Sequence, residues 1–119
     1  MSFNKLNISE KSSQRLSLLK GRTGLESNSI CRLAICISLN DPSIPNPKLY
    51  DNKGRELNKH ELFGDYEKLI IALIKQRCFI DGFNPETDFN SQLLSHLNRG
   101  ISIVSNRVKN LNEIKNLLV

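Results

Sequence analysis

Near the start of the chain, apolar and polar residues alternate. Leu6 and Ile8 fall on one side of this segment. The other side carries Phe3, Lys5 and Asn7. A period of two residues is that of a strand, so the pattern predicts a short N-terminal strand with a polar outer face.

After this strand the apolar period changes to that of a helix. Ser9 is a typical N-cap residue, and Leu16 and Leu19 lie on one face of the segment that follows. Gly21 or Gly24 ends this first helix, because glycine readily takes the left-handed conformation found at helix C-termini.

A second helix is predicted with Ser27 or Asn28 as its N-cap and an end near Asn40, before Pro42. Its inward residues are Ile30, Leu33, Ala34 and Ile37. The other sides are apolar too, except at Arg32. A helix that is apolar nearly all round packs against neighbours on more than one side, and these come either from its own chain or from a second copy.

The rest of the chain predicts a connector and further helices. Residues 41–60 hold three prolines and an Asn-Lys-Gly turn, which indicates a connector followed by a small hairpin or an irregular loop. Helical spacing returns over residues 61–80 and 87–109, although Gly100 weakens the second of these helices. The inward residues expected are Leu62, Tyr66, Leu69, Ile70, Leu73 and Ile74 in the first, and Phe89, Leu93, Leu94, Leu97, Ile101 and Val104 in the second. A last short helix is expected from Asn110.

Basic residues gather at the two ends of this chain of 119 residues with net charge +5. Residues 1–40 hold six basic and two acidic residues, residues 41–90 seven and nine, and residues 91–119 four and one. This asymmetry favours a polyanion such as nucleic acid as partner of the terminal segments, although a modestly basic surface also occurs without one. Aromatic residues make up only 6%, which argues against the stacking platforms of single-strand RNA-binding sheets.

Three cysteines and a polar start suggest where the protein acts. Cys31, Cys36 and Cys78 are an odd number without a CxxC pair, so no disulfide framework is expected. Cys31 and Cys36 lie about 140° apart on a helix, which disfavours a shared metal ion. With no apolar leader and no run long enough to span a membrane, we expect a soluble protein of the cytoplasm.

Catalytic motifs are missing from the sequence. His60 and His96 fit no metal-ligand spacing, and no phosphate-binding glycine loop or nucleophile elbow is present. Three acids lie close in sequence, at Asp81, Glu86 and Asp88, but a solvated turn explains them better than a cation site. We therefore expect no enzyme, no metal and no cofactor, with a nuclease as a minor alternative.

A strand followed by two helices is the order of ribbon-helix-helix DNA-binding proteins, in which two chains pair their strands and insert them into the major groove. The register of the first forty residues also resembles that family. The matching positions are Arg15, Leu16, Leu19, Arg22 to Leu25, Ile30, Arg32, Ala34 and Ile35. The expected fold class is mainly α: a short N-terminal strand, a ribbon-helix-helix-like helical hairpin, and two or three further helices. We expect a single domain, divided into residues 1–41, a Pro-rich connector at 42–60 and a helical part at 61–119.

This arrangement predicts which residues contact DNA. Lys5 and Asn7, on the outer face of the strand, are predicted to touch bases or backbone. Amides at the start of the second helix, residues 27–30, can take a phosphate. The surrounding phosphate contacts are predicted at Lys11, Arg15, Lys20 and Arg22, with a solvated surface charge as the alternative for each.

Arg32 lies off the main inward stripe of the apolar second helix. A charge in such surroundings is costly unless it is paired. We therefore predict that it is paired to an acid of its own or a neighbouring chain, in preference to a phosphate contact. The oligomer interface is predicted at Ile30, Arg32, Leu33 and Ile37.

Over nearly its full length the chain resembles the DndE family of bacterial DNA sulfur modification (phosphorothioation). The resemblance is carried by GRTGLESNSICRLAICISLNDPSIPNP at 21–47, LIIALIKQRC at 69–78 and HLNRGI at 96–101. It implies a DNA-binding accessory subunit without a cofactor, a homotetramer that prefers nicked duplex and acts with the other subunits of the modification complex.

The sequence leaves two alternatives open. If assembly covers the strand, the basic patch would instead combine Lys11, Arg15 and Lys20 with Arg99, Arg107 and Lys109. A sequence-specific ribbon-helix-helix repressor or antitoxin is the alternative function, against which the long segment after Pro42 already counts.

Overall fold

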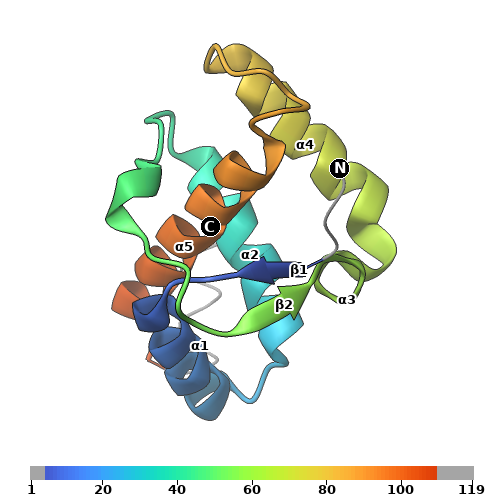
Figure 1. Ribbon diagram of the computed structural model, residues 1–119. Coiled ribbons are helices and arrows are strands. Elements are labelled where there is room, and N and C mark those ends of the chain that lie inside the picture. Colours follow the sequence, from blue (N-terminus) through green and yellow to red (C-terminus); the bar gives the residue numbers. More distant parts are fainter. Residues whose placement is uncertain (1–4, 110–119) are drawn as a thin grey trace.

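Helices make up most of the chain, and two short strands lie between them (Figure 1). The structure is a computed structural model and describes residues 5–109. In chain order the elements are β1 (Lys5–Asn7), α1 (Glu10–Thr23), α2 (Ser27–Asn40), the 3-10 turn η1 (Pro47–Leu49), β2 (Glu56–Asn58), α3 (Lys59–Phe63), the 3-10 turn η2 (Gly64–Tyr66), α4 (Glu67–Ile80) and α5 (Phe89–Arg107). The predicted fold class is confirmed. Phe3 and the helix expected from Asn110 lie outside the described residues.

The bounds of α1 and α2 follow largely from their end residues. Ser9 caps α1 as predicted, since its Oγ accepts a hydrogen bond from the Ser12 amide at 3.0 Å. Gly24, at φ +73°, ends α1 in the left-handed conformation. The predicted cap of α2 is wrong: the N-cap position is Glu26, which makes no side-chain capping bond, and Ser27 is already helical. The end at Asn40 is as predicted.

β1 pairs with β2 of the same chain. The pairing is antiparallel and places Leu6 opposite Leu57, each only 3% exposed. In a ribbon-helix-helix protein the N-terminal strand pairs with its copy in a second chain, so the pairing seen here differs from that expectation. Residues 41–60 form no hairpin of their own; they supply η1 and β2 instead.

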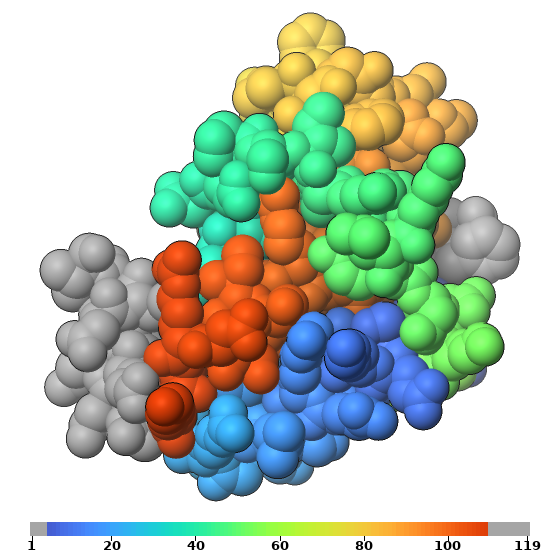
Figure 2. Space-filling model, turned by 90° about the vertical axis from the view of Figure 1, so that its left-hand side faces the viewer, coloured from blue at the N-terminus to red at the C-terminus, as the bar shows by residue number. Residues whose placement is uncertain are grey.

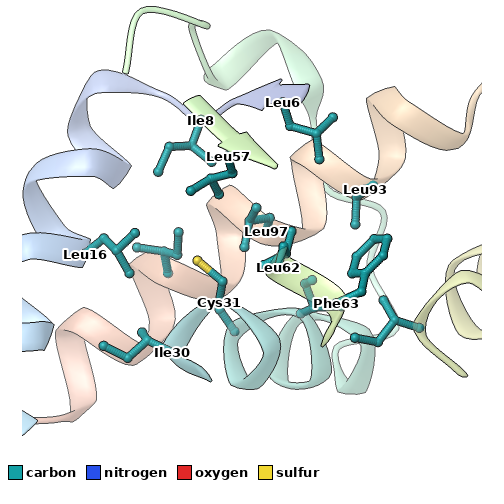
Figure 3. Close-up of a cluster of buried hydrophobic side chains, with 14 of the residues drawn as sticks. Leu6, Ile8, Leu16, Ile30, Cys31, Leu57, Leu62, Phe63, Leu93 and Leu97 are labelled. Carbon is teal, nitrogen blue, oxygen red and sulfur yellow. The ribbon is translucent and has the colours of Figure 1, made fainter. Parts of the chain in front are cut away.

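The core lies beneath the two strands, where α1, α2, α3 and α5 meet, and Ile70, Ile74 and Cys78 of α4 belong to it as well. Figure 3 shows Ile8, Leu16, Cys31 and Leu97 among the side chains that converge there. The inward residues predicted for the helix over residues 87–109, which is α5, are buried, except for Leu94, which is half-buried. In α2 the inward face is rotated from the prediction: Leu33 and Ile37 are half-buried, whereas Cys31 and Ile35 are buried.

The helix predicted over residues 61–80 is broken near its start. Gly64, at φ +53°, ends α3, and a second helix, α4, begins at Glu67. Leu62, Ile70 and Ile74 are buried as predicted. The same prediction is wrong for Tyr66, Leu69 and Leu73, which are 56%, 57% and 40% exposed. None of the helices within residues 5–109 is long and apolar enough to cross a membrane.

The backbones of α2 and α5 touch at Gly100. A Cβ at this position would lie 1.9 Å from the Ala34 carbonyl oxygen, far inside any real contact. Gly100 therefore does not merely weaken α5, as the helix propensity of glycine alone suggests. It permits direct backbone contact between α2 and α5.

We expect Gly100→Ala to lower the free energy of unfolding by about 3 kcal/mol, because the added methyl group meets backbone that cannot rotate away. Gly21→Ala is the matched control, since Gly21 is helical and exposed, and the methyl group that the substitution adds has no atom within 4 Å. The control should gain about 0.5–1 kcal/mol from better helix propensity. Urea unfolding followed by circular dichroism measures both, and equal effects of the two changes would contradict the tight contact.

Candidate nucleic-acid interface

The basic residues predicted on α1 divide between two flanks. At 100° per residue, Lys11, Arg15 and Arg22 lie within about 40° of one another, whereas Lys20 lies on the opposite flank. The buried face between them is formed by Leu16 and Leu19. Lys11, Lys20 and Arg22 are exposed and Arg15 is half-buried. None of the four forms an ion pair with an acid within residues 5–109.

Lys5 and Asn7 lie on the outer face of the small sheet, as predicted, and both are exposed. Each already has a partner in the chain. Lys5 Nζ lies 3.3 Å from a carboxylate oxygen of Glu56 on β2, and Asn7 Nδ2 donates to the Gly54 carbonyl at 3.4 Å. An exposed pair of this kind is weak, so Lys5 can exchange Glu56 for a phosphate at little cost.

Arg55, which the sequence pattern does not single out, places a positive charge at the start of α2. Arg55 Nη1 donates to the hydroxyl of Ser27, in the first turn of α2, at 3.1 Å. Gly54 brings this arginine there, since its amide donates to the Ile8 carbonyl and a side chain at residue 54 would collide with the Ser9 carbonyl. Arg55 strengthens the predicted phosphate position, while Glu26, at the N-cap, opposes it.

The alternative patch at the end of α5 is only partly available. Arg99 is committed to the chain itself: its guanidinium donates to Ser38 and Ser43, and its side chain is 13% exposed. Arg107 and Lys109 are exposed. Figure 2 shows α1, the segment around residues 45–55 and the end of α5 together on one face. The exposed basic residues of these three segments are therefore the candidate nucleic-acid interface, and the Lys11–Arg15–Arg22 flank is the part of it on α1.

His96 lies in the core of the protein and not at its surface. It is fully buried, and its Nδ1 lies 2.8 Å from the hydroxyl of Ser38. This hydroxyl also accepts a hydrogen bond from Arg99 Nε, and it shares one hydrogen with the neutral ring of His96. Burial, followed by the charges of Arg77 and Arg99, lowers the pKa of His96 from 6.5 to about 4.

The three acids that lie close in sequence, the candidates for a cation site, each bind a different partner. Asp81 pairs with Arg77 at 2.8 Å, and Glu86 pairs with Lys75 at 3.1 Å. Asp88 accepts from the Asn84 amide. No three His, Cys, Asp or Glu side chains come together as metal ligands in the described part of the chain.

The thiols are unpaired and mostly buried. Cys31 and Cys78 are buried and Cys36 is exposed, and none of them forms a disulfide. Burial raises the pKa of the Cys31 thiol to about 12, which makes it a packing residue rather than a nucleophile.

An apolar groove lies between α2 and α4. Its volume is about 270 Å³, and its lining includes Leu33 and Cys36 of α2 with Leu69 and Leu73 of α4. Arg32 lies at this groove. Its guanidinium donates to the Leu62 carbonyl at 2.8 Å and to the Ser29 hydroxyl at 3.2 Å, and it lies 5.7 Å from the centre of the Tyr66 ring.

The predicted interface residues thus differ in their availability. Within residues 5–109, Arg32 has a carbonyl, a hydroxyl and a ring as partners rather than an acid. Ile30 is buried in the chain's own core, whereas Leu33 and Ile37 are half-exposed. The sequence pattern predicts Leu69 and Leu73 as core residues, but in the structure both lie at the surface. Helical periodicity alone does not separate a face buried in the core from an apolar face at the surface.

Comparison with known proteins places this chain among DNA sulfur-modification proteins. The family model of the DNA sulphur modification protein DndE matches residues 5–112. The fold is similar to a crystal structure of DndE from Escherichia coli B7A involved in DNA phosphorothioation modification, with TM-score 0.69 and 22% identity over 87% of this chain and 99% of that one. A glycine-to-lysine double mutant of DndE, involved in DNA phosphorothioation, has TM-score 0.69 and 19% identity over the same shares. No curated protein matches the chain in sequence.

We expect the buried, neutral His96 to make the folded state sensitive to acid. Its folded pKa lies below its unfolded value, so its contribution is complete above about pH 6.5 and is lost as the pH falls toward 4. The loss amounts to at most about 3 kcal/mol. Urea unfolding at several pH values between 7.5 and 4 measures it, and His96→Gln should flatten the curve in this range. A wild-type curve that is already flat there would show that His96 is not held neutral.

Proposed function

Because this chain belongs to the DndE family, we propose that it is a DNA-binding accessory subunit of a bacterial DNA phosphorothioation system and has no catalytic role of its own. It would contact the duplex backbone, preferably at a nick, and act in the cytoplasm with the other subunits of the modification complex. The observation that carries this proposal is the α1 flank of Lys11, Arg15 and Arg22, whose charges are not neutralised by acids of residues 5–109. Such cations release counterions when they meet phosphates.

The preference for a nick has a physical rationale beyond the family resemblance. A continuous duplex resists bending, whereas a nick relieves part of that cost. The candidate interface combines a helix flank with the neighbouring segment at residues 45–55 and the end of α5, rather than one straight ridge (Figure 2). A duplex that bends at a nick can reach more of these cations at once.

The alternative functions find less support. A sequence-specific ribbon-helix-helix repressor reads bases with a two-chain ribbon, but here β2 of the same chain occupies one edge of β1. A nuclease needs a base or a metal site, but His96 is buried and the nearby acids are engaged singly. Neither has an observation of its own in its favour.

We further propose that the protein forms a homo-oligomer, with a tetramer as the family resemblance implies, through the groove between α2 and α4. Leu69 and Leu73 expose apolar surface next to Leu33 and Cys36 in this groove. A patch of apolar side chains on a small protein is typical of an interaction surface. Arg32 belongs to this interface as a residue that holds α2, α3 and Tyr66 together.

We expect the double variant Lys11→Ala/Arg15→Ala to bind DNA more weakly, because it removes two phosphate contacts. The slope of log Kd against log salt concentration should fall by about 2 at about 0.9 per contact. Fluorescence anisotropy with labelled intact, nicked and single-stranded DNA over a salt series measures both quantities.

The matched control is Lys68→Ala/Lys75→Ala, which removes two charges from α4. It should leave the salt slope close to that of the wild type. Equal losses in the two double variants would point to net charge rather than to the α1 flank. A wild-type protein that binds none of the three DNAs at low salt would refute the proposed function.

We expect Leu69→Asp/Leu73→Asp to dissociate the oligomer without unfolding the subunit, since the two side chains are 57% and 40% exposed within one chain. Losing two apolar contacts should cost at least about 3 kcal/mol, roughly a hundredfold in the dissociation constant. Sedimentation equilibrium measures the mass. Ile44→Asp, at an exposed loop position outside the groove, is the control and should keep the wild-type mass. A monomeric wild type, or an unchanged mass in the double variant, would contradict this interface.

A further inference from the structure

A second cavity lies between α5, the start of the chain and the connector, away from helix α4 of the apolar groove. Its volume is about 240 Å³. Its lining includes Asn7 of β1, Tyr50 and Asn52 of the connector, and Ser91, Leu94 and Asn98 of α5. In Figure 2 the connector, shown in green, lies against the orange α5 and the blue start of the chain.

The polar groups of this cavity are mostly neutral, and several are unused. Asn98 is only 2% exposed, and its Oδ1 accepts from the Ser9 amide at 3.0 Å. This bond fixes the carboxamide and leaves its Nδ2 donor without a protein partner among residues 5–109. Within the same residues, the side chains of Asn52 and Ser91 and the hydroxyl of Tyr50 form no hydrogen bond to the chain. The side-chain oxygen of Asn7 has no partner in the described part of the chain, since the hydrogen bond of this residue to Gly54 uses its Nδ2.

Apolar surface completes the lining. The Tyr50 ring, Leu94 and Pro47 supply it, and Tyr50 is half-buried. At about 240 Å³ the cavity is smaller than the roughly 300–1,000 Å³ of sites for drug-sized ligands. It therefore suits a single small ring system with apolar faces and with donors and acceptors at its edge.

The charge of the cavity argues against an anion inside it. Among the described residues, Asp51 is the one charged member of the lining, and its carboxylate accepts hydrogen bonds from the amides of Glu10 and Lys53. A phosphate would be repelled from this position. The positive charges of Arg15 and Arg99 act on Tyr50 from close by without lining the cavity. A ligand with a neutral ring inside and a phosphate outside would satisfy both regions.

We propose that this cavity binds a nucleobase, either an unpaired base of DNA or a free nucleoside. Asn98 offers an unused donor, Asn7 an unused acceptor and Asn52 both, which suits the donors and acceptors of a base edge. An aromatic ring such as that of Tyr50 stacks on the face of any base. The DNA form of this proposal rests on the proposed function, and it extends that function: the α1 flank holds the backbone next to a nick, while the cavity takes a base that has left the stack there.

The first experiment compares two nicked duplexes that differ at one residue. One carries a single unpaired adenine at the nick, and the other carries an abasic residue in its place. The wild type should bind the adenine-bearing duplex roughly tenfold more tightly, as expected for one base stacked on an aromatic side chain. Fluorescence anisotropy competition at one salt concentration measures the ratio.

Two variants and a control locate the effect. Tyr50→Ala removes the stacking ring, and Ser91→Trp fills the cavity from an exposed position on α5. Both should reduce the ratio to about one while keeping the affinity for the abasic duplex. Thr87→Trp adds the same ring at an exposed position that does not line the cavity, and it should keep the wild-type ratio.

The second experiment tests free nucleosides and does not depend on DNA binding. Adenosine and cytidine are titrated into the ¹⁵N-labelled protein. Shifts of the backbone amides of Asn52, Ser91 and Asn98 that are lost in Ser91→Trp would assign the cavity to a nucleoside. This arm remains decisive even if the wild type binds no duplex and the proposed function fails.

The outcomes separate the two sources of the base. A base preference that the two variants abolish supports an unpaired base of DNA. Nucleoside shifts without a base preference in DNA support a free nucleoside. A wild type that shows neither a preference for the adenine-bearing duplex nor shifts at the lining amides overturns the proposal.

Discussion

The contact between α2 and α5 at Gly100 is the constraint on which the rest of the structure depends. With no side chain at residue 100, the α5 backbone lies directly against the Ala34 carbonyl. The residues just before Gly100 then connect α5 to the ends of two other helices. Asn98 binds the amide of Ser9 at the start of α1, and Arg99 donates to the Ser38 carbonyl near the end of α2. One turn of α5 thus positions α1 and α2 together.

The end of α2 illustrates how the buried charges are satisfied. A helix leaves its last carbonyls without partners, and here two arginines supply the missing donors. Arg77 binds the carbonyls of Leu39, Asp41 and Ser43, and it also pairs with Asp81. Arg99 binds those of Ser38 and Ser43. Cations at a helix C-terminus also complement the helix dipole, so these arginines stabilise the fold and are not available to DNA.

Local patterns in the sequence were enough to predict α1, the end of α2 and most of the buried residues of α5. Capping residues and helical spacing act within one turn, so they can be recognised without knowing the fold. Non-local contacts were not predictable in this way. β1 pairs with a strand about fifty residues away, and Arg55 reaches the start of α2 only because that pairing brings it there. The split at Gly64 depends on a positive φ that a helical pattern does not reveal. For the site, the α1 lysine and arginines could be nominated from the sequence, but the engagement of Arg99 could not.

The two proposed surfaces are compatible because they lie on different helices. In Figure 1, α1 lies at the bottom of the molecule, and α4 starts beside α3 on the right and runs upward, away from α1. Copies joined through Leu69 and Leu73 would therefore leave the Lys11–Arg15–Arg22 flank of each subunit uncovered. An oligomer would present several such flanks to one duplex, and linked contacts bind more tightly than a single one since the later contacts form at high effective concentration. If the proposed function holds, this arrangement would let a subunit with few exposed cations on each flank hold DNA through the contacts of several subunits.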